Sequence, residues 1–146
     1  MARRTLDAAD AVQFAAAIAR ANSWLTAGSP GNTLEAAAML LALPKSDAVR
    51  KKCLEPILRA QTSDGGWGPR LQVPAEAFDT AVVLLALEAA GVTQPIAQGR
   101  AFLIGMQQAP GGWPETTRPS GQISYAEHIS TTAWVLSALL ATRDSR

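Results

Sequence analysis

One candidate for proton-transfer chemistry in this sequence is its single histidine, His128. Glu127 precedes it, and a neighbouring carboxylate can hold an imidazole in its charged form, as general acid–base catalysis requires. Tyr125 and Glu115 lie nearby in the sequence. A histidine at the start of a helix is also common as a surface residue or a cap, so both roles stay open.

Metal and redox chemistry find little support in the sequence. Cys53 is the only cysteine, so it cannot form a disulfide within the chain, and its neighbours show no pattern of a reactive thiol. One cysteine and one distant histidine match a zinc site by number only. We expect no metal, no cofactor and a reduced, cytoplasmic protein.

The charge and the length exclude several classes of protein. Among 146 residues there are 13 Lys and Arg against 12 Asp and Glu, without a stripe of either sign, so we expect no nucleic-acid partner. No stretch is apolar over the roughly 18 residues that a membrane span requires. Asp7 and Asp10 interrupt the N-terminal stretch where a signal peptide would be apolar. The length suits one soluble domain, residues 1–146.

Helices must position any site in this chain, because alanine and leucine are abundant and glycine and proline mark the breaks. Residues 36–43 and 81–87 are apolar on every side, which indicates inner helices surrounded by protein. Residues 47–59 have one apolar and one charged side, which is typical of an outer helix facing solvent. Their alternation predicts an all-α fold of antiparallel hairpins in two layers. The predicted helices are Asp7–Ala27, Thr33–Leu43, Ser46–Gln61, Ala75–Ala90, Thr93–Gln108 and Ser124–Thr142.

A short motif recurs between outer and inner helices. Residues 61–67 read Gln-Thr-Ser-Asp-Gly-Gly-Trp and residues 107–113 read Gln-Gln-Ala-Pro-Gly-Gly-Trp, with a period of 46 residues between Trp67 and Trp113. This period lies within the range of helical repeats and predicts three hairpins. The glycines allow a tight turn, the glutamine amide can bind free helix-end groups, and the indole can cover that contact.

Both segments resemble the QW motif of squalene-hopene and oxidosqualene cyclases, which protein prenyltransferase β subunits share in weaker form. The resemblance covers about residues 46–142, and Trp24 with the glycines after it looks like a degenerate copy. In that family the motif ties neighbouring outer helices together. The resemblance therefore implies a structural role for Gln61, Trp67, Gln107 and Trp113.

The same resemblance indicates where a catalytic acid would lie. Class II cyclases protonate their substrate with the central Asp of an Asp-x-Asp-Asp-Thr-Ala motif, and residues 76–81 here read Glu-Ala-Phe-Asp-Thr-Ala. Phe78 thus occupies the proton-donating position and cannot donate a proton. Asp79 has a plainer interpretation as a carboxylate that stabilises the N-terminus of its helix.

Aligning the repeats predicts which residues share the site. The alignment matches Asp79 with Glu35 and Thr131, and Glu76 with His128, so these side chains should lie at one end of the inner layer. Residues 130–134, Ser-Thr-Thr-Ala-Trp, resemble the start of the last inner helices of hopene cyclases. The predicted catalytic residues are Asp79, His128 and Glu76, and the predicted substrate-binding residues are Phe78, Tyr125, Glu127 and Trp134.

The resemblance implies an α/α toroid, of which this chain would supply half a ring of about six helices. Exposed apolar flanks on the terminal hairpins would favour a homo-oligomer, such as a homodimer, or a companion protein that completes the ring; polar termini that cap the array are the alternative. We expect an isoprenoid or polyene in the inner-helix cavity, with acid–base cyclisation or isomerisation if the chain is an enzyme. The alternative is a non-catalytic binding or interaction module, and the fold alone does not decide between them.

Overall fold

The structure is a computed structural model that describes residues 5, 8–118 and 125–144, with the side chain of Tyr125 excepted. Its helices lie within the six ranges predicted from the sequence, and the described residues form no strand apart from one isolated bridge between Gln61 and Trp67. The all-α prediction is therefore confirmed. The helices are α2 (Ala15–Ala27), α3 (Thr33–Ala42), α4 (Asp47–Arg59), α5 (Ala77–Ala90), α6 (Ile96–Gly105) and α7 (Tyr125–Ala141).

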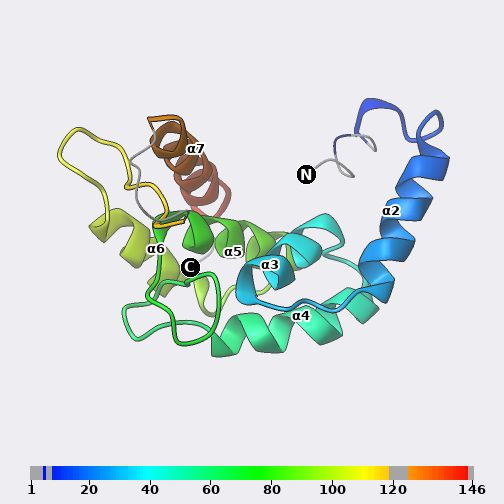
Figure 1. Cartoon of the computed structure of the whole chain (residues 1–146), viewed down its shortest axis with the longest axis horizontal. Coiled ribbons are helices and arrows are strands. Elements are labelled where there is room, and N and C mark those ends of the chain that lie inside the picture. The colour runs from blue at the N-terminus through cyan, green and yellow to red at the C-terminus, as the bar shows by residue number, and fades with distance from the viewer. Residues whose placement is uncertain (1–4, 6–7, 119–124, 145–146) are drawn as a thin grey trace.

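The helices form an inner and an outer layer (Figure 1). Helices α3, α5 and α7 lie side by side, with α5 between the other two, and α4 and α6 pack against α3 and α5. Helix α5 is the centre of the core, because Ala81, Val83, Leu84 and Leu87 are all fully buried. The division into inner and outer helices that the hydropathy pattern predicted is present.

The structure shows which consecutive helices pair as hairpins, a point that the sequence pattern left open. The consecutive helices that pack closely are α3 with α4 and α5 with α6, each an inner helix followed by an outer one. Short turns at 43–46 and 91–95 join these pairs, whereas the longer segments 60–76 and 106–124 lead from an outer helix to the next inner one. Helix α2 and helix α7 stand at the two ends of the array.

An arginine from an outer helix closes the C-terminus of each of the last two inner helices. Arg50 of α4 donates to the carbonyl oxygen of Ala90 at 2.6 Å, and Arg100 of α6 donates to that of Leu139 at 2.6 Å. The last carbonyl groups of a helix have no partner within the helix and carry partial negative charge, so a guanidinium group there is doubly favourable. These contacts fix the outer helices to the ends of the inner ones.

Helix α2 begins later than predicted because Asp10 interrupts the first helical turns. Its carboxylate accepts hydrogen bonds from the backbone N–H groups of Val12 and Gln13, at 3.0 and 2.8 Å. A short polar side chain that binds nearby backbone N–H groups competes with the helical hydrogen bonds. The backbone therefore turns at residues 11–14 before α2 starts at Ala15.

Candidate functional site

The first QW motif joins three helices. The indole Nε1 of Trp67 donates to the carbonyl oxygen of Ile57 on α4 at 2.8 Å, and its backbone N–H donates to Oγ1 of Thr80 on α5 at 2.9 Å. The ring is fully buried against α6, where a Cβ atom built on Gly99 would lie 2.7 Å from Cζ3 of the indole. Gln61 donates from Nε2 to the carbonyl oxygen of Pro95, the N-cap of α6, at 3.2 Å. The motif thus ties outer helix α4 to outer helix α6.

The second QW motif repeats these contacts in part. Nε1 of Trp113 donates to the carbonyl oxygen of Leu103 on α6 at 2.6 Å, and its backbone N–H donates to Oγ1 of Thr132 on α7 at 3.1 Å. Thr132 therefore takes the place of Thr80, in agreement with the repeat alignment that matched Asp79 with Thr131. Trp24, by contrast, lies inside α2 with 77% of its surface exposed, so the degenerate copy does not act as a third motif.

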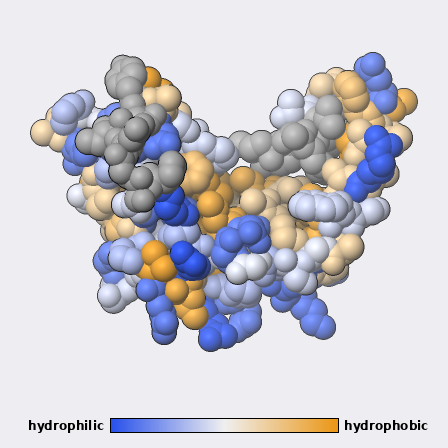
Figure 2. All heavy atoms as spheres, viewed as in Figure 1, coloured by the Kyte–Doolittle hydropathy of each residue, from blue (hydrophilic) through white to orange (hydrophobic). Residues whose placement is uncertain are grey.

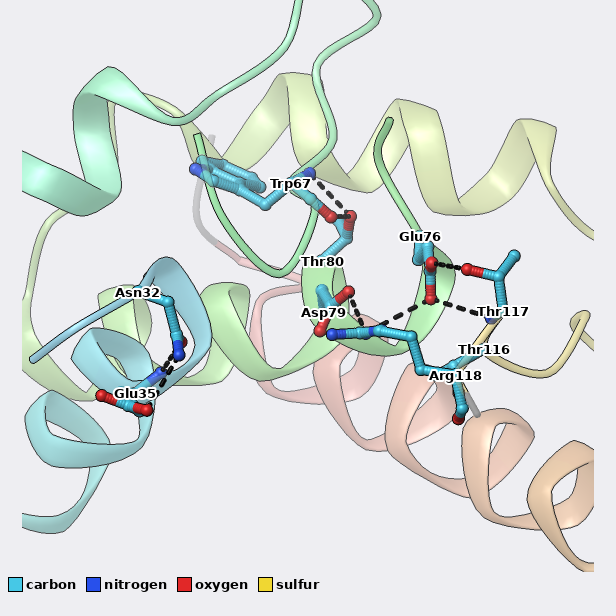
Figure 3. Close-up of polar contacts among 9 residues, drawn as sticks. All are labelled: Asn32, Glu35, Trp67, Glu76, Asp79, Thr80, Thr116, Thr117 and Arg118. Atoms are coloured by element: carbon cyan, nitrogen blue, oxygen red, sulfur yellow. Dashed lines mark hydrogen bonds and ion pairs between the residues drawn. The ribbon is translucent and has the colours of Figure 1, made fainter. Parts of the chain in front are cut away.

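Two of the predicted catalytic residues share one arginine at the N-terminus of α5 (Figure 3). Nη2 of Arg118 lies 2.6 Å from Oδ2 of Asp79 and 3.3 Å from Oε2 of Glu76. Thr117 adds a hydrogen bond from its hydroxyl group to Oε1 of Glu76, at 2.6 Å. The loop that follows Trp113 is thereby fixed to the first turn of α5, and both carboxylates already have a charged partner.

Asp79 is the only fully buried member of this cluster among the residues described, and its second carboxylate oxygen, Oδ1, has no hydrogen-bond partner. Burial raises the pKa of Asp79 above its ordinary value of 3.8, and the hydrogen bond and charge of Arg118 offset part of that rise. A carboxylate in the first helical turn agrees with the interpretation that Asp79 stabilises the N-terminus of its helix. Asp79 interacts with the positive charge of Arg118 as well as with the helix dipole.

The raised pKa gives a pH-dependent prediction for Asp79→Asn. A folded state with a raised carboxyl pKa binds the proton more tightly than the unfolded chain does. The contribution of Asp79 to stability is therefore greatest below 3.8 and is lost as the pH rises through the raised pKa. Asparagine does not titrate, so the wild type should lose stability relative to Asp79→Asn as the pH rises.

Urea unfolding of both proteins between about pH 3 and pH 7 measures this difference. A wild type that instead gains stability relative to Asp79→Asn with rising pH would show that the Arg118 pair outweighs burial and lowers the pKa.

His128 lies in a separate contact from Glu76 and Asp79. Its Nδ1 is 3.4 Å from Oε2 of Glu115, and both side chains are largely buried, with 31% and 20% of their surfaces exposed. The carboxylate beside the imidazole is therefore Glu115, from the loop after Trp113, and the neighbour expected from the sequence, Glu127, lines a pocket instead. An imidazole held by a carboxylate retains the potential for proton transfer.

The predicted ligand-binding residues lie mostly on the facing sides of α5 and α7. The rings of Phe78 and Trp134 pack edge to face, with centroids 5.9 Å apart and an interplanar angle of 80°. Phe78 also lines a shallow pocket of about 190 Å³ with Glu127 and Thr116. The side chain of Tyr125 lies outside the described residues. Three of the four predicted residues are thus brought to one end of the inner layer.

Segment 114–118 connects these groups across the N-terminal ends of the inner helices. Glu115 contacts His128 of α7, Thr116 lines the pocket beside Phe78 of α5, and Arg118 lines a second pocket beside Leu34 of α3. Glu35, which the alignment matched with Asp79, instead bonds to Asn32, the N-cap of α3 (Figure 3). Oδ1 of Asn32 accepts from the backbone N–H of Glu35, and the Glu35 carboxylate accepts from Asn32 Nδ2, each at 2.8 Å. The expected cluster is therefore divided into an Arg118 group and a His128 group.

The described residues contain no group of three or more His, Cys, Asp and Glu side chains that could hold a metal ion. None of the helices in the described part of the chain combines the length and apolar character that crossing a bilayer requires.

Comparison with known proteins supports the family indicated by the two QW motifs. The profile of the squalene-hopene cyclase C-terminal domain matches residues 24–146. No curated protein matches the chain. The matched range begins at Trp24 and contains α3 to α7, both QW motifs and every residue of the candidate site. The chain therefore belongs to the squalene-hopene cyclase C-terminal domain family.

Proposed function

We propose that this chain binds an apolar isoprenoid or polyene against the concave face of its inner helices and leaves that ligand chemically unchanged. The Phe78–Trp134 pair carries the proposal. It places two aromatic rings in contact on neighbouring inner helices, at a position where the resemblance to class II cyclases would call for an acid. Aromatic rings provide large apolar area for a hydrocarbon chain and cannot protonate it.

An apolar stripe continues from Phe78 along α5 and supports an elongated ligand. Val82, Leu85 and Ala89 follow at helical spacing on the same side of the helix, and Phe78, Leu85 and Ala89 are each only partly buried. Hydrophobic residues also cover the hollow between the arms formed by α2 and α7 (Figure 2). Exposed apolar surface that gathers in one place can mark a binding site.

The carboxylates near this surface have other partners, which favours binding over protonation. Glu76 and Asp79 both pair with Arg118, and Glu76 also accepts from Thr117. An acid held as an ion pair is a poor proton donor to an alkene. We therefore propose a structural role for this cluster, in which it positions segment 114–118 at the end of the inner layer.

Calorimetric titration with farnesol in a fixed concentration of non-ionic detergent tests the proposal. We expect Phe78→Ala to weaken binding about tenfold, because roughly 1.4 kcal/mol of apolar contact is lost with the ring. Phe102→Ala is the matched control: Phe102 is a partly buried phenylalanine on outer helix α6, against Gly66, and its loss should leave the affinity unchanged. Equal losses in both variants would contradict a site at Phe78.

A second candidate function is acid–base catalysis, which the contact between His128 and Glu115 favours. Mass spectrometry of the ligand recovered from the same incubations separates the two functions. Unchanged farnesol supports binding alone. A cyclised or isomerised product that disappears in His128→Ala, with folding intact, would overturn the non-catalytic proposal and assign proton transfer to the imidazole.

A further inference from the structure

Helix α7 is the one inner helix without an outer partner in the described part of the chain. Helix α3 packs on α4 and α5 packs on α6, whereas no described outer helix follows α7. One side of α7 accordingly exposes large apolar side chains: Ile129 is 51% exposed, Leu136 47% and Leu140 67%. Together with Ala133 they are spaced as a single stripe along the helix.

The repeat alignment identifies what this stripe corresponds to in α5. Thr80 and Thr132 make the same hydrogen bond with the tryptophan of their QW motif, so they mark equivalent positions. Leu136 follows Thr132 by the same interval as Leu84 follows Thr80. Leu84 is fully buried, and a Cβ atom built on Gly99 of α6 would lie 2.9 Å from its Cδ2. The exposed side of α7 therefore matches the side of α5 that receives an outer helix.

The second QW motif also lacks a contact that an outer helix after α7 would supply. Gln61 donates both to Gly65 and to the carbonyl oxygen of Pro95 at the start of α6. Gln107, at the equivalent position, is exposed, and within the described residues its amide donates to the carbonyl oxygen of Gly111 alone, at 2.9 Å. By analogy with Pro95, the second acceptor for the Gln107 amide would be a carbonyl oxygen at the N-terminus of an outer helix that follows α7.

Helix α2 lacks the opposite partner. It precedes inner helix α3 and contacts α4, which is the position of an outer helix, and no inner helix packs against it among the described residues. Ile18 is its only buried residue. Its exposed face carries small side chains, Ala16, Ala19 and Ser23, which allow close approach of another helix, as Gly99 does on α6.

We infer that a second copy of this chain covers the exposed side of α7 with its own α2. In the α5–α6 pair, an outer helix packs against an inner one. Helix α7 is an inner helix that lacks such an outer partner, and α2 is an outer helix that lacks such an inner partner. Helices α2 and α7 project on the same side of the molecule, with a hollow between them (Figure 1, Figure 2). If a twofold axis relates two copies, the α2 helix of each copy lies against the α7 helix of the other, so two copies close the ring. This contact does not depend on the ligand proposed above.

Sedimentation velocity of the ligand-free full chain tests the inference. The wild type should sediment at twice the chain mass of 15.3 kDa. Leu136→Lys should give monomer, because it places a charge in the centre of the contact. Leu58→Lys is the matched control: Leu58 lies on outer helix α4 with 45% exposure, close to the 47% of Leu136, and this variant should remain dimeric. Leu140→Lys gives a second test should Leu136→Lys unfold.

Mixing two variants tests the head-to-tail arrangement. Ala19→Glu on α2 and Leu136→Lys on α7 should each be monomeric alone, whereas their mixture should form a heterodimer. In that heterodimer one α2–α7 contact is unaltered and the other pairs the new carboxylate with the new ammonium group. A monomeric wild type, a mixture that stays monomeric, or equal dissociation by Leu58→Lys and Leu136→Lys would overturn the inference. Larger open-ended assemblies would overturn the closed dimer.

Discussion

Replacing Trp67 with alanine will lower the free energy of unfolding by about 3–5 kcal/mol. The indole is fully buried, and its removal leaves a cavity between α4, α5 and α6. It also removes one of the two hydrogen bonds to the carbonyl oxygen of Ile57, which then accepts only from the backbone N–H of Ala60. Trp113→Ala should fall in the same range, because Trp113 is equally buried and makes the corresponding hydrogen bond to Leu103.

Urea denaturation followed by far-ultraviolet circular dichroism measures the effect without relying on tryptophan fluorescence. Trp24→Ala is the control, because Trp24 is 77% exposed and an exposed substitution should change stability by no more than about 0.5 kcal/mol. If Trp67→Ala and Trp24→Ala cost the same, the QW motif does not hold the helices together.

The substitution Gly99→Ala will destabilise the chain by about 1–3 kcal/mol, although alanine is the better helix former. The new methyl group would lie 2.7 Å from the Trp67 ring and 2.9 Å from Leu84. Both side chains are fully buried, so neither can move away without disturbing the core.

Gly105, on the same helix, supplies the matched control for Gly99. Nothing lies within 4 Å of a Cβ atom built there, so Gly105→Ala should raise the free energy of unfolding, by up to about 1 kcal/mol. Thermal and urea unfolding of the pair would show opposite signs. Two substitutions with the same sign would mean that α6 does not pack closely on Trp67.

The sequence was sufficient to predict the helices and the repeat, because both depend on local patterns. Apolar runs on every side identified α3 and α5 as inner helices, and the glycine pairs before Trp67 and Trp113 marked the turns. The alignment that matched Asp79 with Thr131 also puts Thr80 and Thr132 in register, and the structure shows that these two make equivalent hydrogen bonds. Local patterns could not show which consecutive helices pack together as hairpins, because that depends on contacts between separate elements.

The candidate site was predicted less completely, because its contacts join residues far apart in the chain. Arg118 was missed although it pairs with both Glu76 and Asp79, since it lies in a loop without periodicity. The signal available in the sequence was that Arg118 is the one cationic residue between α6 and α7. The partner of His128 was predicted from adjacency, but Glu127 and His128 are neighbours in a helix and point in different directions. Glu115 reaches the imidazole from the preceding loop.

The contacts of Trp67 also determine how the chain comes apart. Its indole and backbone bind α4 and α5, and its ring rests on α6, so none of the three can leave without exposing the same buried ring. Such shared burial makes them a single cooperative unit, or foldon. Helix α2 shares none of this burial and is joined to α4 through the Lys52 ammonium group, which donates to the carbonyl oxygens of Leu25, Thr26 and Gly28. It can therefore detach in a sub-global opening that leaves the unit around Trp67 folded.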